Sequence, residues 1–177
     1  MTRALVVNAG SSSLKFGLFA AGDDAHALLS GRVERLGGDA TLTVEDAHGK
    51  AHASRRVPEV RDHAGALRAA LDAVAAAEPD ARIVAVGHRV VHGGKDHAAP
   101  ERIDAALIDT LRGLVPFAPL HQPHNIAGIE AARAAFPDAV QVACFDTAFH
   151  RGHAFETDAF ALPRAYYDKG VRRYGFH

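Results

Sequence analysis

The chain has 177 residues, of which 48% are hydrophobic and 23% are charged, a composition typical of one globular domain. Twenty Lys and Arg residues against 21 Asp and Glu residues argue against a nucleic-acid or anionic-membrane partner, since either favours a basic surface. The sequence contains no run of about 18 apolar residues, so it predicts no membrane-spanning helix. The single cysteine, Cys144, excludes an internal disulfide, and we therefore expect a cytoplasmic protein.

The first part of the chain predicts antiparallel strands. Apolar and β-branched residues at 4–8 and alternating residues at 14–19 flank a Gly-Ser turn, which indicates a β-hairpin. Further strands over 28–36, 41–46 and 51–57 continue it as an antiparallel meander.

The rest of the chain alternates helices with strands, so we predict an α/β domain with a mixed sheet. A short helix near 163–168 is expected within a polar and aromatic C-terminal loop. The remaining elements are predicted as helices over 62–78, 104–114 and 123–136, and as buried strands over 82–91 and 139–145.

The turn of the first hairpin combines groups that suit a phosphate or its metal ion. The first strand ends at Asn8, the turn carries Ser11, Ser12 and Ser13, and Lys15 lies on the returning strand. Backbone amides, hydroxyls and one ammonium can together bind a polyanion. It is not a P-loop, because a strand and not a helix follows. A plain serine-rich hairpin is the alternative.

The segment GHRVVHGGK offers histidines and one arginine. His88 and His92 have the i,i+4 spacing of a helical zinc pair, but in a strand this spacing separates them by about 13 Å, which argues against zinc. Arg89 lies on the opposite face, just before a glycine turn, and its guanidinium is suited to a carboxylate or phosphate. A structural arginine at the sheet edge is the alternative.

The segment PLHQPHN lies at the entry of a predicted helix. Pro123 suits an early helical position, and His124 or Asn125 the cap region. His121 or His124 can donate to a phosphoryl oxygen, or each can be a capping histidine.

Asp146 follows directly after a buried strand, where α/β proteins place their chemistry. A carboxylate there can position a nucleophile, accept a proton or hold magnesium, or it can simply cap a helix. A hydrolase triad of Ser12, His121 and Asp146 is disfavoured, because the chain has no G-x-S-x-G elbow.

Five segments in this order, NAGSSSLKF, GHRVVHGG, PLHQPHNIAGI, CFDTAFH and YGFH, resemble the acetate kinases, the acetate/propionate kinase group of the sugar-kinase/Hsp70/actin superfamily. The resemblance implies a ribonuclease-H-like mixed sheet with flanking helices over residues 1–150. It implies that residues 151–177 begin an active-site loop region, which leads to a second, nucleotide-binding domain.

The same resemblance implies reversible phosphoryl transfer from ATP to acetate, and less well to propionate, giving acetyl phosphate and ADP with Mg²⁺ (or Mn²⁺). A carboxylate nucleophile is already ionised at neutral pH, so we expect Asp146 to orient groups or magnesium. The pattern assigns Asn8 to the metal, Ser11, Ser13 and Lys15 to ATP, Arg89 to the carboxylate, Val91, Leu120 and Phe176 to the methyl pocket, and Asp146, His121 and His177 to catalysis.

The chain departs from the family pattern in two respects. Gln122 stands where the pattern usually has Asn, and family members are roughly twice as long. The chain thus resembles an N-terminal half without the adenosine site, and the family implies a homodimer. We expect the isolated chain to self-associate or to need the missing half; the alternative is a non-catalytic remnant that acts as a binding or interaction module.

Overall fold

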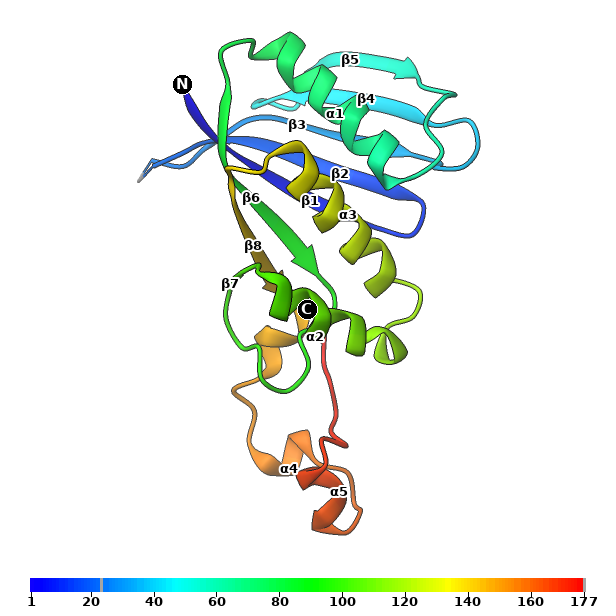
Figure 1. Ribbon diagram of the computed structural model, residues 1–177, viewed down its shortest axis with the longest axis vertical. Helices are drawn as coiled ribbons and strands as arrows, with labels where there is room; N and C mark the ends of the chain where they lie inside the picture. Colours follow the sequence, from blue (N-terminus) through cyan, green and yellow to red (C-terminus); the bar gives the residue numbers. More distant parts are fainter. Residues whose placement is uncertain (23, 177) are drawn as a thin grey trace.

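The computed structural model describes residues 1–22 and 24–176, which form one mixed eight-stranded sheet, three longer helices and a projecting arm (Figure 1). The strand order is β5-β4-β3-β2-β1-β6-β8-β7. The strands are β1 (Thr2–Ala9), β2 (Ser13–Ala20), β3 (Ala27–Glu34), β4 (Thr41–Asp46), β5 (Ala51–Arg56), β6 (Arg82–Val90), β7 (Glu101–Arg102) and β8 (Val140–Phe145).

The pairing follows the predicted pattern. Strands β1 to β5 form an antiparallel meander, and β6 and β8 add to β1 as parallel strands. The two-residue edge strand β7, antiparallel to β8, was not predicted, because so short a strand has no periodicity to read. The expectation of a mixed sheet with flanking helices is confirmed.

The longer helices are α1 (His63–Ala77), α2 (Ala105–Gly113) and α3 (Gln122–Ala135). Asp62 caps α1 and Asp104 caps α2, each accepting a hydrogen bond from a backbone N–H three residues later. In α3 the cap position falls on His121 and Pro123 lies in the first turn. The prediction that His124 or Asn125 caps this helix is wrong, because both already lie inside it.

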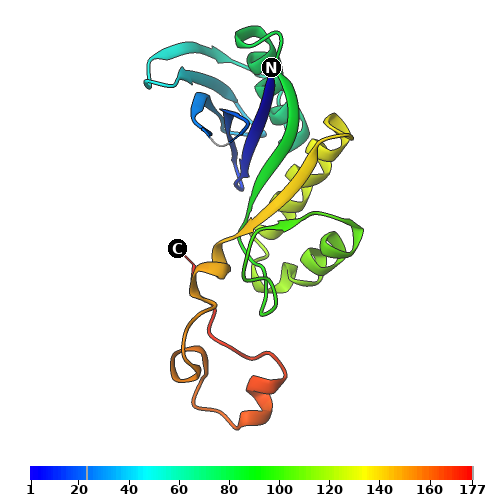
Figure 2. The ribbon, with the colours of Figure 1, turned by 90° about the vertical axis from the view of Figure 1, so that its left-hand side faces the viewer.

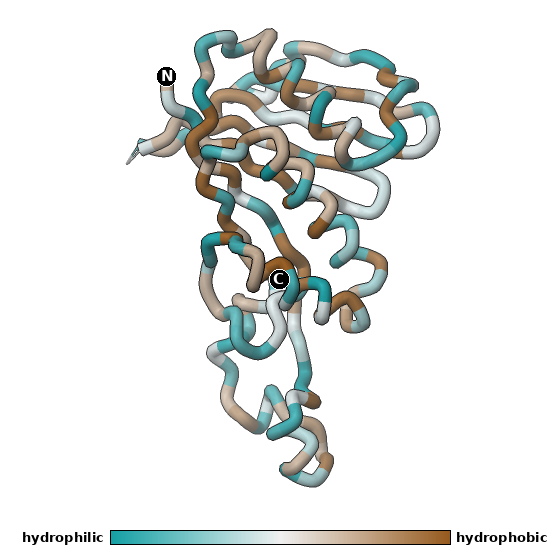
Figure 3. Tube along the Cα trace, viewed as in Figure 1, coloured by the Kyte–Doolittle hydropathy of each residue, from teal (hydrophilic) through white to brown (hydrophobic). Residues whose placement is uncertain are grey.

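All three helices pack on one face of the sheet (Figure 2). Leu5 and Val7 of β1 and Leu14 and Leu18 of β2 point to this face and are almost completely buried. The apolar stretches run along these central strands (Figure 3). On the opposite face no described helix covers the sheet, and Val6 stays 42% exposed. None of the helices in the described part of the chain is long and apolar enough to span a bilayer.

Residues 151–176 extend from the sheet as an arm with two short helices, α4 (Phe155–Asp158) and α5 (Arg164–Asp168) (Figures 1 and 2). Its centre is polar: the buried Asp158 carboxylate accepts from Arg151 Nη2 at 2.8 Å, Tyr167 Oη at 3.1 Å and Arg172 Nη1 at 3.3 Å. Burial alone would raise the pKa of Asp158, but these bonds and charges lower it. An ion-pair cluster therefore replaces an apolar core in the arm.

Candidate active site

A cleft of about 600 Å³ opens where the parallel strands β1 and β6 end, the place where α/β sheets gather their functional side chains. It brings together most of the residues that the sequence singled out, from four separate segments of the chain. The predicted residues that line it are Asn8, Ser11, Ser13, Arg89, Val91, Leu120, His121 and Phe176.

Arg89, held from behind by the buried Asp146, forms the charged side of this cleft. Asp146 follows β8, and its carboxylate, 5% exposed, accepts from Arg89 Nε at 2.9 and 3.1 Å and from Nη2 at 2.7 Å. This two-pronged bond raises the pKa of Arg89 and fixes the plane of its guanidinium. The Arg89 side chain is 43% exposed, and Nη1 makes no hydrogen bond within residues 1–22 and 24–176. One edge of the Arg89 guanidinium, which Asp146 holds in place, thus faces the cleft.

The helix-cap alternative for Asp146 is not what the structure shows. Asp146 begins a 3-10 helix, Asp146–His150, whose cap position is Phe145, and no side chain makes a capping bond there. The bond to Arg89 takes both carboxylate oxygens instead.

The Gly10–Ser13 turn forms the opposite side of the cleft. The turn is closed by a bond from the Gly10 amide to the Ser13 carbonyl at 2.8 Å, and His63 Nε2 lies 2.7 Å from the Gly10 carbonyl. Because a carbonyl can only accept, His63 Nε2 carries the proton. Among the described residues, the amides of Ser11 and Ser12 have no hydrogen-bond acceptor, and both residues are exposed. This turn therefore offers free N–H groups to an anion.

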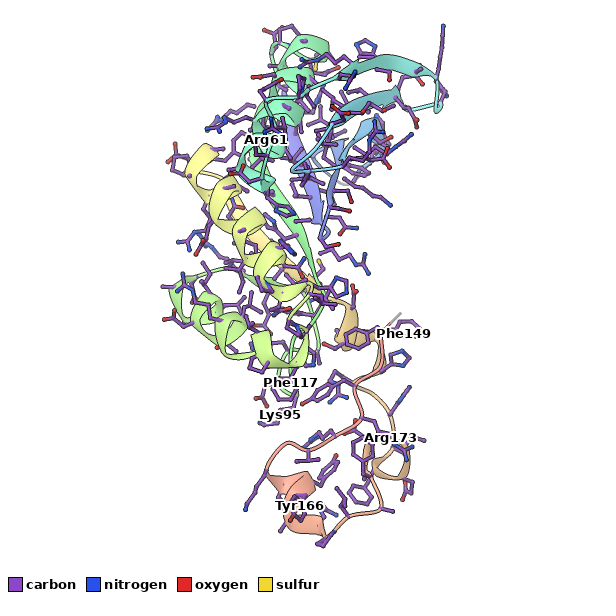
Figure 4. All side chains as sticks on the ribbon, turned by 90° about the vertical axis from the view of Figure 1, so that its right-hand side faces the viewer. Arg61, Lys95, Phe117, Phe149, Tyr166 and Arg173 are labelled. Carbon is purple, nitrogen blue, oxygen red and sulfur yellow. The ribbon has the colours of Figure 1, made fainter. Side chains whose placement is uncertain are left out.

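The segment between α2 and α3 supplies an apolar wall that sequence reasoning found only in part. Leu120, 73% exposed, was predicted, whereas Phe117, Ala118 and Pro119 were not, although they adjoin it in sequence. Phe117 lies at the junction with the arm, as does Phe149 (Figure 4). Apolar side chains next to the Arg89 cation suit a small, partly apolar anion.

The histidines of the site have different surroundings. His121 is exposed and lines the cleft, whereas His124 packs against the His63 ring with 4.9 Å between centroids. Burial, and then the charges of His63 and His121, lower the pKa of His124. His177, the last residue, lies outside the described residues.

The rings of His88 and His92 point to different partners. His88 Nε2 bonds the Gln141 side chain at 2.8 Å on the helix-covered face, and burial lowers the pKa of His88. His92 Nδ1 accepts from the Gly94 amide at 2.9 Å, and its ring packs on Tyr174 and Phe176. Each histidine thus has a structural partner of its own.

Lys15 is not part of the cleft. It lies opposite Asn8 in the β1–β2 ladder, so both side chains occupy the open face of the sheet, but Lys15 lines a separate hollow with Ser30, Arg32 and Glu34. The strand β2, which carries Lys15, was correctly predicted.

A magnesium site is judged by the oxygen atoms that the cleft offers. Asn8 supplies an amide oxygen, and Ser11 and Ser13 supply hydroxyls, while Asp146 already binds Arg89. Within residues 1–22 and 24–176, no three His, Cys, Asp or Glu side chains converge as a metal cage. This donor set fits Mg²⁺ that arrives with a nucleotide's phosphates, since Mg²⁺ retains waters and needs few protein ligands.

Comparison with known proteins decides the family. The model of the acetokinase family matches residues 3–177. The chain belongs to the acetokinase family. It is 48% identical over 188 residues to the acetate kinase of Methylocella silvestris and 49% identical over 180 residues to that of Rhizobium meliloti, in both cases over its whole length.

Solved structures of this family have the same fold. The chain superposes on Porphyromonas gingivalis acetate kinase with a TM-score of 0.87 at 33% identity, and on a Francisella tularensis propionate kinase with 0.89 at 29% identity, covering all of this chain and 45% of each structure. The chain likewise covers 46% of each of the two curated relatives, so it spans about half of their length.

Proposed function

We propose that this acetokinase-family chain supplies the carboxylate site and the phosphate-facing turn of an acetate kinase, which transfers a phosphoryl group reversibly between MgATP and acetate. One observation carries the proposal: the same cleft is lined by Arg89, which Asp146 orients, and by a turn whose Ser11 and Ser12 amides have no acceptor among the described residues. Phosphoryl transfer depends mostly on positioning and on stabilising spread charge, which are what such groups provide.

The carboxylate binds to the open edge of Arg89. Its charge pairs with a guanidinium whose orientation Asp146 has already fixed, so little ordering is needed on binding. Val91, Leu120 and Phe176 receive the methyl group. One further methylene changes the free energy of binding by only about 1–3 kcal/mol, so propionate is a poorer substrate and not an excluded one.

Asp146 acts by orientation in this proposal. Acetate is ionised at neutral pH, since the pKa of a carboxyl group is about 4, and no proton needs to be removed from the nucleophile. Both Asp146 oxygens accept from Arg89, which supports a positioning role for this carboxylate.

The phosphate side is formed by the first hairpin. Ser11 and Ser13 face the transferred group, His121 donates to its oxygens, and Asn8 contributes an oxygen ligand to the Mg²⁺ that accompanies ATP. Bound Mg²⁺ neutralises charge on the phosphates. We assign His177 to transition-state stabilisation and Lys15 to an ATP phosphate, both by the family pattern.

The adenosine site belongs to the part of the relatives that this chain does not span. We propose residues 1–150 as the first domain and residues 151–177 as the start of a loop region that leads to a nucleotide-binding domain. A cytoplasmic homodimer is our proposal for the whole enzyme. The isolated chain, with Val6 exposed on an uncovered sheet face, is expected to self-associate.

Acyl-phosphate formation, trapped as the hydroxamate, tests this function. The chain alone should form product at the no-enzyme rate, because in-line transfer needs ATP held against the acceptor. A chimera that carries this chain in place of the matching part of Methylocella silvestris acetate kinase should form it with Mg²⁺, ATP and acetate. A folded chimera without activity, or one whose activity survives Arg89→Leu and Asp146→Ala, would contradict the proposal.

A further inference from the structure

The turn after β6 is held by an unusual set of side chains. Four consecutive backbone N–H groups, those of residues 91–94, each donate to a buried side chain and not to the backbone. The bonds are Val91 N to Asn125 Oδ1 at 2.9 Å, His92 N to Gln122 Oε1 at 3.2 Å, Gly93 N to Thr147 Oγ1 at 2.9 Å and Gly94 N to His92 Nδ1 at 2.9 Å.

Three of these acceptors come from elements on either side of the turn. Gln122 and Asn125 are three residues apart in the first turn of α3, so both side chains reach the same place, and Thr147 lies in the 3-10 helix after β8. Gln122 and Thr147 are fully buried and Asn125 nearly so. A buried polar side chain must be hydrogen-bonded to avoid a large desolvation cost, so these residues are committed to the turn.

The two amide side chains make a second bond each. Gln122 Nε2 donates to the His92 carbonyl at 2.9 Å, and Asn125 Nδ2 donates to the Ala9 carbonyl at 2.8 Å. Gln122, which stands where the family pattern usually has Asn, thus bonds both polar groups of the His92 backbone. Asn125 ties the end of β6 to the end of β1, and so one side of the cleft to the other.

This arrangement fixes the residues that face the ligand. Val91 lines the cleft and Arg89 lies two residues before it, while the Asp146 that orients Arg89 immediately precedes Thr147. A shift of the turn therefore moves the apolar wall and the arginine relative to Asp146. Because its amides are all occupied, the turn serves as a scaffold and not as an anion site.

We propose that Gln122, Asn125 and Thr147 are positioning residues that hold the 91–94 turn, and through it Arg89 and Val91, in the geometry that binds the substrate carboxylate. This inference rests on the proposed function, since it specifies how that carboxylate site is kept in shape. None of the three residues needs to touch the substrate.

Two isosteric changes test the proposal on the whole chain. Thr147→Val removes the hydroxyl at constant shape, and Gln122→Met removes the amide; Thr147→Ser keeps the hydroxyl and is the rescue variant. The control is Gln141→Met, because Gln141 is also a buried amide with two bonds but contacts His88 and the Phe136 carbonyl, away from the turn. The readouts are hydrogen exchange of amides 91–94 and the dissociation constant of ¹³C-acetate by NMR.

Thr147→Val and Gln122→Met should each speed exchange of these amides and weaken acetate binding about tenfold, the ratio expected when one buried hydrogen bond is lost. Thr147→Ser and Gln141→Met should leave both readouts near those of the unchanged chain. Unchanged exchange and affinity in both test variants, or equal losses in Gln141→Met, would overturn the proposal. If the unchanged chain binds no acetate, the proposed function fails, whereas the exchange rates still show whether these side chains hold the turn.

Discussion

The Gly10–Ser13 turn and the Val91–Gly94 turn end neighbouring parallel strands at the same cleft, yet their backbone amides are used in opposite ways. In the second turn all four N–H groups donate to side chains, three of which come from α3 and the segment after β8. In the Gly10–Ser13 turn, the amides of Ser11 and Ser12 have no acceptor among the described residues. Both turns contain glycine, so composition alone does not separate a scaffold from a binding turn.

The difference assigns the two sides of the cleft to different tasks. A turn whose N–H groups are already bonded presents side chains, here Arg89 and Val91, in fixed positions. A turn with free N–H groups presents its backbone to a charged ligand. The same strand-end geometry thus provides a carboxylate side and a phosphate side.

The largest expected effects separate these sides kinetically in the active chimera. His121→Ala on the phosphate side should lower kcat about 10²- to 10³-fold with little change in the KM for acetate, because its bond forms to the transferring group. Arg89→Leu should mainly raise the KM for acetate, by about 10- to 100-fold, since it removes a charged hydrogen bond to the bound carboxylate. Steady-state kinetics with varied acetate checks both, and exchanged signatures would reverse the assignment of sides.

A second pair of variants compares the tolerance of the turns to one added methyl group. At Gly93 a Cβ would lie 2.7 Å from Phe145 Cγ, so Gly93→Ala should lower the free energy of unfolding by about 1–3 kcal/mol. At Gly10 the atom nearest to an added Cβ is the Ser13 hydroxyl oxygen at 3.3 Å, so Gly10→Ala should change the free energy of unfolding by less than about 0.5 kcal/mol. Urea unfolding of both variants measures the difference; equal losses would show that the two turns are packed alike.

A smaller effect is expected from pH. Burial, and then the charge of Arg151, lower the pKa of His92 below its usual value, so the neutral ring is the folded form. Its contribution to stability is complete above about pH 6.5 and is lost as the pH falls through the lowered pKa, because protonated Nδ1 cannot accept from Gly94.

Site-resolved NMR between pH 7.5 and 4.5 measures this effect. The Gly94 amide should shift and exchange faster at the acidic end. A Gly94 amide that is insensitive to pH would show that His92 does not hold the turn.

Much of the fold was predictable because its signals are local. Apolar, β-branched and alternating residues between turn residues predicted β1 to β5, the spacing of apolar residues predicted α1, and Asn8, Arg89 and Asp146 were each expected at or near the end of a strand. What the sequence did not reveal depends on tertiary register. The Arg89–Asp146 pair is 57 residues apart, and Asn125, expected near a helix cap, instead bonds two strand ends.

Lys15 shows the same limit from the other direction. Its place in the NAGSSSLKF segment suggested a position beside the turn residues, but in this chain Lys15 lines the hollow beside Arg32, and its assignment to an ATP phosphate stays a prediction. Proximity in sequence to a binding turn does not establish proximity in space, since a side chain two residues along a strand lies about 7 Å away.

The most direct test of the account is an acetate titration of the ¹⁵N-labelled chain, compared with its Arg89→Leu variant. We predict saturable shifts centred on the Arg89 side chain and on the amides near Val91 and His121, lost in Arg89→Leu while the rest of the spectrum is unchanged. Shifts elsewhere on the molecule, or acetate binding that persists without Arg89, would contradict the assignment of this cleft as the carboxylate site.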